Sequence, residues 1–327
     1  MAAGVLAVVC GPGTGCMPKD PALGPAGTGG AGAPDGAAAG SGGSAASTGG
    51  GGGAPSPDGG IAIGGAGGEG GALGGCPESP APLRPTGTTL ELPIDLVFDG
   101  KPFVFGEANA VSSTANALPL NIRFYLSKAE LLTAAGVSVP LDIVDGTGAV
   151  QPYGLFFFNA DDATMQTLRV RAPAGTYTGL KIELGLPVAC SRGDGGGRAF
   201  PLSSDSQMTW PHLLGYYLSF RYDSLVMPNA EAMAVGEGVP SSIHMGADLK
   251  NPNLPGALVF RIAGALTIPA TGGPVTKRLR LAMDQVFMGA TAAVDLTDFP
   301  FTMLPEVAAG ERLRLTGAGL PLFVFGP

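Results

Sequence analysis

The chain has 327 residues, of which only 13% are charged, and its formal net charge is −8. A weakly charged acidic chain whose sequence has no basic stripe is a poor candidate for binding nucleic acid, and anionic lipid would attract it little. Its composition also changes sharply along the chain, which predicts segments of different kinds.

Residues 1–19 contain a short apolar run that ends at Val9, followed by Cys10 and Cys16. The run is too short to span a bilayer and resembles the apolar region of a secretory signal, although the usual basic start is missing. Cys10 or Cys16, followed by a long tether, resembles the lipidated cysteine of a bacterial lipoprotein, although neither is preceded by a good lipobox. We therefore expect an exported protein, periplasmic or anchored by lipid at the outer membrane or cell surface.

Residues 20–87 are predicted to form a disordered linker. Up to residue 75 they are almost entirely Gly, Ala, Ser, Pro and Thr, and no aromatic residue precedes Phe98. Such a segment cannot bury enough apolar area to offset its chain entropy. Residues 88–327 are long enough for a sizeable core and form the predicted folded domain.

The folded domain is predicted to be all-β. Thr89–Phe98 and Lys101–Phe105, joined by Asp99-Gly100, have the pattern of a β-hairpin. Residues 120–127 and 129–132 together are predicted to form the next strand, which turns at Ala135-Gly136 into 137–139. Further strands are predicted at residues 153–158, 167–170, 177–186, 215–221, 257–262, 277–283 and 293–296. Tyr177 follows a turn, at a position where β-sandwiches often fix a corner with a tyrosine. Short strands between Gly and Pro turns, without a sustained 3.6-residue period, predict an antiparallel β-sandwich.

Two cysteines, Cys76 and Cys190, lie in or beside the predicted domain. In an oxidising compartment they are a candidate disulfide, which would close a long loop and stabilise the fold by about 4–5 kcal/mol, less any strain. The alternative is that Cys76 belongs to the linker and Cys190 is a free thiol. We favour the disulfide.

Sequence motifs for catalysis are missing. The chain has no Ser nucleophile elbow, phosphate loop or dinucleotide fingerprint. The acidic pairs Asp142/Asp145 and Asp161/Asp162 lack the ligand spacing of a calcium loop and are interpreted as solvated loop residues. The sequence therefore predicts a binding protein and not an enzyme.

The single tryptophan and the two histidines lie close to methionines. Trp210 and His212 follow Met208, and His244 directly precedes Met245. Imidazole and thioether ligands suit copper, particularly Cu(I), better than hard cations. The opposing interpretation is that the tryptophan packs in the core and the histidines are incidental, because two ligands at this spacing match no closed zinc pattern.

Five segments follow one another in a distinctive order. They are LPIDLVFDGKPF at 92–103, NIRFYLSKAELL at 121–132, APAGTYTGLKIELGLP at 172–187, MTWPHLLGYY at 208–217 and IHMG at 243–246. In this order they resemble the MbnP-like family of bacterial copper-binding proteins. Members of that family are exported and are commonly paired with a di-haem peroxidase-like partner that oxidises a protein tryptophan to kynurenine.

The resemblance implies a copper site. Related surface copper proteins of methanotrophs bind Cu(I) with two histidines and a kynurenine, arranged as Trp-x-His plus a distant His. By this resemblance Trp210 is the residue oxidised to kynurenine, and His212 and His244 are the copper ligands. Met208 or Met245 would add a weak further contact.

This chain departs from the family pattern in two ways. Many members have four cysteines in the domain, whereas this chain has Cys190 and Cys76 in or beside it. Many also have a second tryptophan at the position of His212, and the histidine found here favours a metal site.

The sequence thus predicts an exported copper-binding β-sandwich. The alternative is a metal-free cell-surface interaction or adhesion module that uses the loops of the sandwich. A carbohydrate-binding module is disfavoured because it would use several exposed aromatic side chains, and the chain has one tryptophan. Copper stoichiometry separates the first two possibilities.

Overall fold

The structure is a computed structural model that describes residues 76–84, 86–112, 115–191, 196–210, 216–227, 238–246, 257–287, 301–302 and 321–326. All of these residues belong to one compact unit, residues 66–327. Cys10, Cys16, His212 and the strand predicted at 293–296 lie outside the described residues.

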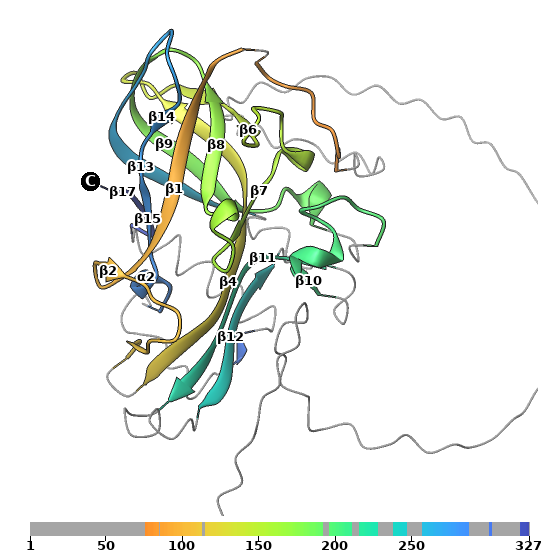
Figure 1. Ribbon diagram of the computed structural model, residues 1–327, viewed down its shortest axis with the longest axis vertical. Helices are drawn as coiled ribbons and strands as arrows, with labels where there is room; N and C mark the ends of the chain where they lie inside the picture. The colour runs from red at the N-terminus through yellow and green to blue at the C-terminus, as the bar shows by residue number, and fades with distance from the viewer. Residues whose placement is uncertain are drawn as a thin grey trace, which may run out of the picture. The chain divides into compact units, whose positions relative to one another are not determined.

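Strands make up most of the described chain (Figure 1). They are β1 Thr88–Phe98, β2 Lys101–Pro102, β3 Asn109–Ala110, β4 Asn116–Leu132, β5 Ser138–Pro140, β6 Asp142–Val144, β7 Phe156–Asn159, β8 Thr167–Ala172, β9 Gly175–Gly185, β10 Thr209–Trp210, β11 Tyr216–Met227, β12 Val239–Gly246, β13 Ala257–Ile268, β14 Val275–Thr276, β15 Leu279–Ala282, β16 Phe301–Thr302 and β17 Phe323–Phe325. The helical segments are the 3-10 turns η1 Pro152–Gly154, η2 Ala163–Met165, η3 Val188–Cys190 and η4 Ser204–Ser206, and the short α-helix α2 Asp284–Phe287. Among the described residues, no helix has the length and apolar character needed to span a bilayer.

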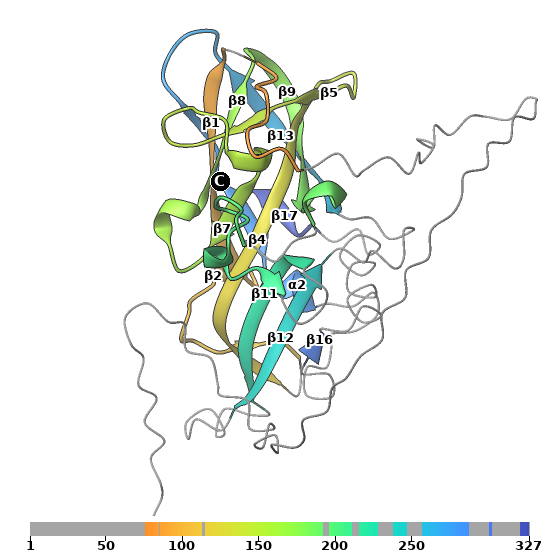
Figure 2. The same cartoon turned by 90° about the vertical axis from the view of Figure 1, so that its right-hand side faces the viewer.

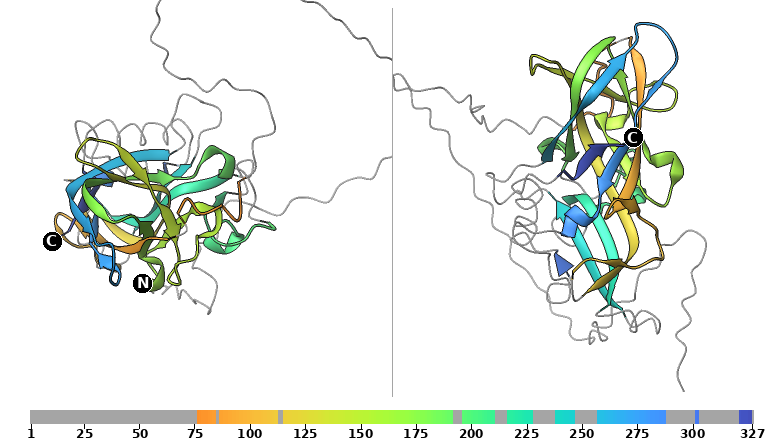
Figure 3. Two further views of the ribbon diagram at one scale, coloured as in Figure 1. Left: turned by 90° about the horizontal axis from the view of Figure 1, so that it is seen from above. Right: turned by 90° about the vertical axis from the view of Figure 1, so that its left-hand side faces the viewer.

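The strands form two sheets, which confirms the predicted β-sandwich. One sheet has the order β17-β15-β1-β8-β6, with β2 and β14 also paired to β1; the other has the order β13-β9-β4-β11-β12-β16, with β3, β5 and β7 paired to β4 and β10 paired to β11. Most pairs are antiparallel, but β15 and β14 run parallel to β1, and β16 runs parallel to β12. In Figure 3, right, the blue strands beside the C-terminus are β15 and β17, which pair with each other, and β15 also pairs with β1.

The long strand β4 connects the two halves of the larger sheet. Its first half pairs with β11 and its second half with β9, so β11 and β12 lie beside its lower part in Figure 2. The strand predicted from residues 120–127 and 129–132 lies within β4, and a register irregularity between Leu126 and Lys128 marks where the pairing with β9 shifts. Strand β12, which contains His244, was not predicted.

Alternation of side chains along the strands builds the main core between the sheets. Leu92 and Ile94 of β1 are buried there together with Ile122 and Phe124 of β4 and Phe220 of β11. Phe124 stacks on Phe158 of β7, with ring centroids 4.4 Å apart. The predicted hairpin is confirmed, because Phe98 pairs with Lys101 across a turn whose central residues Asp99 and Gly100 both have positive φ.

A second apolar cluster covers part of the outer face of the larger sheet. Tyr125 and Phe157 project from β4 and β7, and the segment after β9 packs over them with Leu202 and Met208. The predicted disulfide is confirmed: Cys190 in this segment is bonded to Cys76. The segment between β9 and β11 is therefore tied down at a point close to its start and leads directly into β10.

Two smaller predictions have different outcomes. The Tyr177 hydroxyl donates a hydrogen bond to the carbonyl of Pro173 at 3.0 Å, which confirms the predicted corner. Asp142 is not a solvated loop residue: it lies in β6, is 4% exposed, and accepts hydrogen bonds from the backbone N–H groups of Leu83 and Arg84. The error arose because the paired-acid pattern carries no information about a distant segment that would supply donors.

Candidate metal centre

A row of polar residues crosses the outer face of the larger sheet. The cross-strand register places Asn159 beside Arg123, Arg123 beside Arg221, and Arg221 beside His244. Residues opposite each other on paired strands point to the same face, and their chain neighbours point to the other. These polar side chains therefore lie on the outer face of the sheet, and the side chains on the opposite face of the same strands form the core.

Asp223 links two members of this row. Its Oδ1 lies 2.6 Å from Nε2 of His244, and its Oδ2 accepts a hydrogen bond from Nε of Arg221 at 2.7 Å. All three side chains are between 13% and 18% exposed. Burial raises the pKa of the Asp223 carboxyl, but the contacts with His244 and Arg221 outweigh burial and keep that pKa below its ordinary value.

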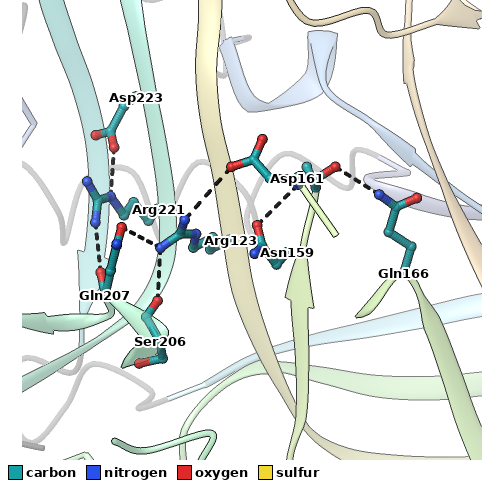
Figure 4. A network of polar contacts seen from close by, with 9 residues as sticks. Arg123, Asn159, Asp161, Gln166, Ser206, Gln207, Arg221 and Asp223 are labelled. Carbon is teal, nitrogen blue, oxygen red and sulfur yellow. Dashed lines mark hydrogen bonds and ion pairs between the residues drawn. The ribbon is translucent and has the colours of Figure 1, made fainter. Parts of the chain in front are cut away.

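The two arginines hold the segment that leads into β10. Arg221 Nη1 donates to the backbone carbonyl of Gln207 at 2.7 Å, and Arg123 Nη1 donates to Oε1 of the same residue at 2.7 Å (Figure 4). Arg123 also donates to the carbonyl of Ser206 at 3.1 Å. Gln207 has a left-handed backbone conformation, with φ 54°, which is uncommon for a residue other than glycine.

The far end of the network reaches the loop after β7. Arg123 Nη2 lies 3.8 Å from the carboxylate of Asp161, and the Asp161 N–H donates to Oδ1 of Asn159. Burial, and then the neighbouring charge of Arg221, lower the pKa of Arg123. Two guanidinium groups side by side are thus balanced by the carboxylates of Asp161 and Asp223.

The structure brings two of the predicted site segments to one strand. Trp210 in β10 pairs with Tyr216 at the start of β11, and His244 in β12 pairs with Arg221 further along β11. His212 lies between β10 and β11, outside the described residues. The Trp210 segment and the His244 strand are therefore both hydrogen-bonded to β11.

The two methionines are both buried, on opposite faces of the larger sheet. Met208 is fully buried in the second cluster, against the outer face of the sheet. Met245 is buried in the main core, and because it is next to His244 on a strand its side chain lies on the opposite face. The structure therefore does not place Met245 with His244.

Sequence reasoning missed the polar residues that are connected to His244 through Asp223 and Arg221. Asp223, Arg221, Arg123 and Gln207 come from different strands and carry no common motif, so only the sheet register brings them together. Within the described ranges, no group of three or more His, Cys, Asp or Glu side chains could hold a metal ion.

The protein is thus a β-sandwich, and the outer face of its larger sheet carries a row of polar residues that includes His244. The chain matches the MbnP family model over residues 87–294 and belongs to that family, which is linked to copper handling and is methanobactin-related. A solved structure of MbnP from Methylosinus trichosporium is 20% identical and has a TM-score of 0.47; the match covers 73% of this chain and 98% of that one. No curated protein matches the chain.

Proposed function

We propose that this protein binds Cu(I) through His212 and His244 and that it is a binding protein and not an enzyme. The observation that carries the proposal is the contact between Asp223 and Nε2 of His244 at 2.6 Å. A histidine that ligates a metal usually gives its other ring nitrogen to a carboxylate or carbonyl, which fixes the ring. An imidazole held in this way fits a nitrogen-preferring ion such as copper.

Membership of the family supports the choice of metal. Two imidazoles leave a metal ion with few ligands, a coordination that suits the d10 ion Cu(I). The tryptophan beside His212 would contribute after oxidation, because the arylamine of kynurenine adds a weak donor that an indole lacks. Met208 remains a candidate for a weak contact from the β10 side.

We also propose that a di-haem peroxidase-like partner oxidises Trp210 to kynurenine, and that the protein is exported and anchored through Cys10 or Cys16. The long Gly-rich segment before residue 76 would then let the domain stand away from the membrane. These proposals rest on the family and on the sequence of the first residues.

Copper affinity measured by competition with a chromophoric Cu(I) chelator tests the site. His244→Ala and His212→Ala should each weaken binding by more than about 100-fold, since loss of an outer-shell partner alone weakens a metal site by about 10- to 100-fold. Thr267→Ala, at an exposed position on β13 of the same sheet, is the control and should bind as the wild type does. Equal affinity in all four proteins would show that the histidines do not hold the metal.

The mass of the Trp210 peptide, taken from protein made in its native host, tests the oxidation. Kynurenine has one carbon fewer and one oxygen more than tryptophan. Stoichiometric copper with an unmodified peptide would keep the binding function and remove the partner. A wild-type protein without copper affinity would leave the metal-free interaction module as the function.

A further inference from the structure

We propose that a cavity beside strand β1 binds a small organic anion with one carboxylate group and an apolar body, and that Arg280 pairs with this carboxylate. The cavity has a volume of about 470 Å³, and ligand sites usually have volumes of roughly 300–1,000 Å³. Its lining comes from β1, β2, β7, β15 and the loops next to them, and includes none of the proposed copper ligands. The inference therefore does not depend on the proposed copper site.

The cavity lies where β1 passes from one neighbouring strand to another. In Figure 1, β8 lies beside the upper part of β1, where it pairs with residues 88–93, and β2 lies near the lower end, where it pairs with residues 97–98. Residues 94–96 pair with neither of these strands, and the N–H of Ile94 donates instead to the carbonyl of Gln166, just before β8. This interruption of the sheet leaves an opening between β8 and β2.

Aromatic rings form much of the apolar lining of this opening. Phe103 and Phe105, which follow β2, lie edge to face with ring centroids 6.0 Å apart. Phe158 of β7 borders the cavity from the larger sheet. Contact with such rings removes a large apolar area from water, which is a favourable term in binding. A ligand that fills the cavity would therefore need an apolar body.

Three charged side chains also line the cavity. Asp95 and Arg280 are directly opposite each other on the parallel strands β1 and β15. The carboxylate of Asp95 pairs instead with Arg278, whose Nη1 lies 2.7 and 2.9 Å from its two oxygens. Arg280 makes no ion pair or hydrogen bond within the part of the chain that the structure describes. The described lining thus has one guanidinium without a counter-charge.

This combination of groups selects one class of ligand. A guanidinium presents two parallel N–H donors that match a carboxylate. Because Asp95 and Arg278 compensate each other, a ligand with one negative charge is favoured, and further negative charges would be repelled by Asp95. Gln166, the remaining polar side chain of the lining, already donates from Nε2 to the carbonyl of Ala160 at 2.8 Å. The cavity therefore fits a monocarboxylate with a ring or a short alkyl chain.

Nuclear magnetic resonance titrations of the ¹⁵N-labelled full chain test the ligand class. Three probes, benzoate, phenylacetate and hexanoate, combine one carboxylate with an apolar body. At least one of them should bind saturably and shift backbone amide resonances of β1 and β15. Benzamide has the ring of benzoate without its charge, and acetate has the charge without a ring. Each should bind at least about 10-fold more weakly than the tightest probe, since the first loses a charged hydrogen bond and the second loses apolar burial.

Substitutions test the role of each charge with the probe that binds most tightly. Arg280→Gln should weaken its binding by about 10- to 100-fold, the equivalent of a hydrogen bond to a charged group. Arg280→Lys keeps the charge but not the paired donors, so it should weaken binding less. Asp95→Asn should tighten binding severalfold, because it removes a negative charge and leaves Arg278 unpaired. Arg261→Gln, an exposed arginine on β13 of the larger sheet, is the matched control and should change nothing.

Several results would overturn the proposal. They are no saturable binding of any of the three carboxylates, equal affinity for benzoate and benzamide when benzoate is the tightest probe, and equal effects of Arg280→Gln and Arg261→Gln. Weaker binding by Asp95→Asn would also contradict it, as would shifts confined to strands of the larger sheet. Thermal unfolding shows whether each variant folds. If Arg280→Gln does not fold, Arg280→Lys and the comparison of benzoate with benzamide still decide the question.

Discussion

Two buried tyrosines make the stability of the domain sensitive to alkaline pH. Tyr125 and Tyr222 are at most 1% exposed, and burial raises the pKa of both hydroxyls above the ordinary value of 10.0. A group whose folded pKa is raised stabilises the fold fully below its unfolded pKa and loses that contribution as the pH rises above it. The free energy of unfolding, measured by urea titration, should therefore decrease from about pH 10 upward.

Phenylalanine variants of these two residues should separate charge from hydrogen bonding. The Tyr125 hydroxyl donates to the carbonyl of Pro201 at 2.8 Å, so Tyr125→Phe should cost about 1–2 kcal/mol at pH 7. The Tyr222 hydroxyl lies near Ser224 but makes no hydrogen bond of good geometry within the described residues, so Tyr222→Phe should cost less at pH 7 than Tyr125→Phe. In both variants the free energy of unfolding should decrease less steeply above about pH 10 than in the wild type. The same pH dependence as in the wild type would show that these two hydroxyls do not cause the decrease.

Among single residues, His244 could be proposed as a metal ligand from the sequence because the chain has only two histidines and imidazole is a common metal ligand. The sequence could not predict that Asp223 contacts His244, because no motif in the residues around Asp223 distinguishes it from the other acidic residues of the chain. The register of β11 against β12 creates the contact, and β12 itself was not predicted. Its sequence, VPSSIHMG, contains a proline, two serines and a glycine, which weaken the β-strand pattern.

At the element scale, the pairing of β9 with β13 depends on a glycine. Gly179 lies opposite Ala263 just before a register shift, and a Cβ atom there would meet the carbonyl oxygen of Ile262 at 2.6 Å. The obstacle is backbone in the centre of a strand pair, so it cannot rotate away. Gly179→Ala should therefore destabilise the domain by about 1–3 kcal/mol, the usual range for overpacking.

Gly146 provides a matched control for this substitution. A Cβ atom at Gly146 would meet nothing within 4 Å, and its backbone does not require glycine. Gly146→Ala should leave the free energy of unfolding unchanged or raise it by up to about 1 kcal/mol, because alanine reduces the entropy of the unfolded chain. Equal effects of the two substitutions in thermal unfolding would show that the close approach at Gly179 does not constrain the strand pair.

At the scale of the whole molecule, the alternating pattern of strands such as β1 and β9 was sufficient to predict a sandwich. The pattern could not predict which sheet each strand joins, because that is decided by contacts between distant segments. Residues 76–84 are an example: by composition they belong to the predicted linker, yet Cys76 is bonded to Cys190 and Asp142 accepts two backbone hydrogen bonds from the segment. The folded domain therefore depends on residues before the predicted boundary at 88.

This dependence can be measured with two shortened chains. A chain that starts at residue 76 keeps the disulfide and the contacts to Asp142, so its thermal unfolding midpoint should equal that of the full chain. The double variant Cys76→Ser/Cys190→Ser loses a crosslink between residues 114 apart and should be less stable by up to about 4–5 kcal/mol.

A chain that starts at residue 87 should be less stable than that double variant. It loses the same crosslink and also leaves the buried carboxylate of Asp142 without the N–H groups of Leu83 and Arg84. An unsatisfied buried acceptor costs about 1–3 kcal/mol, and the neighbouring Arg171, 3.6 Å from Asp142, can offset only part of it. If the two shortened chains unfold at the same temperature, the segment before residue 87 is a tether only, and the sandwich is complete without it.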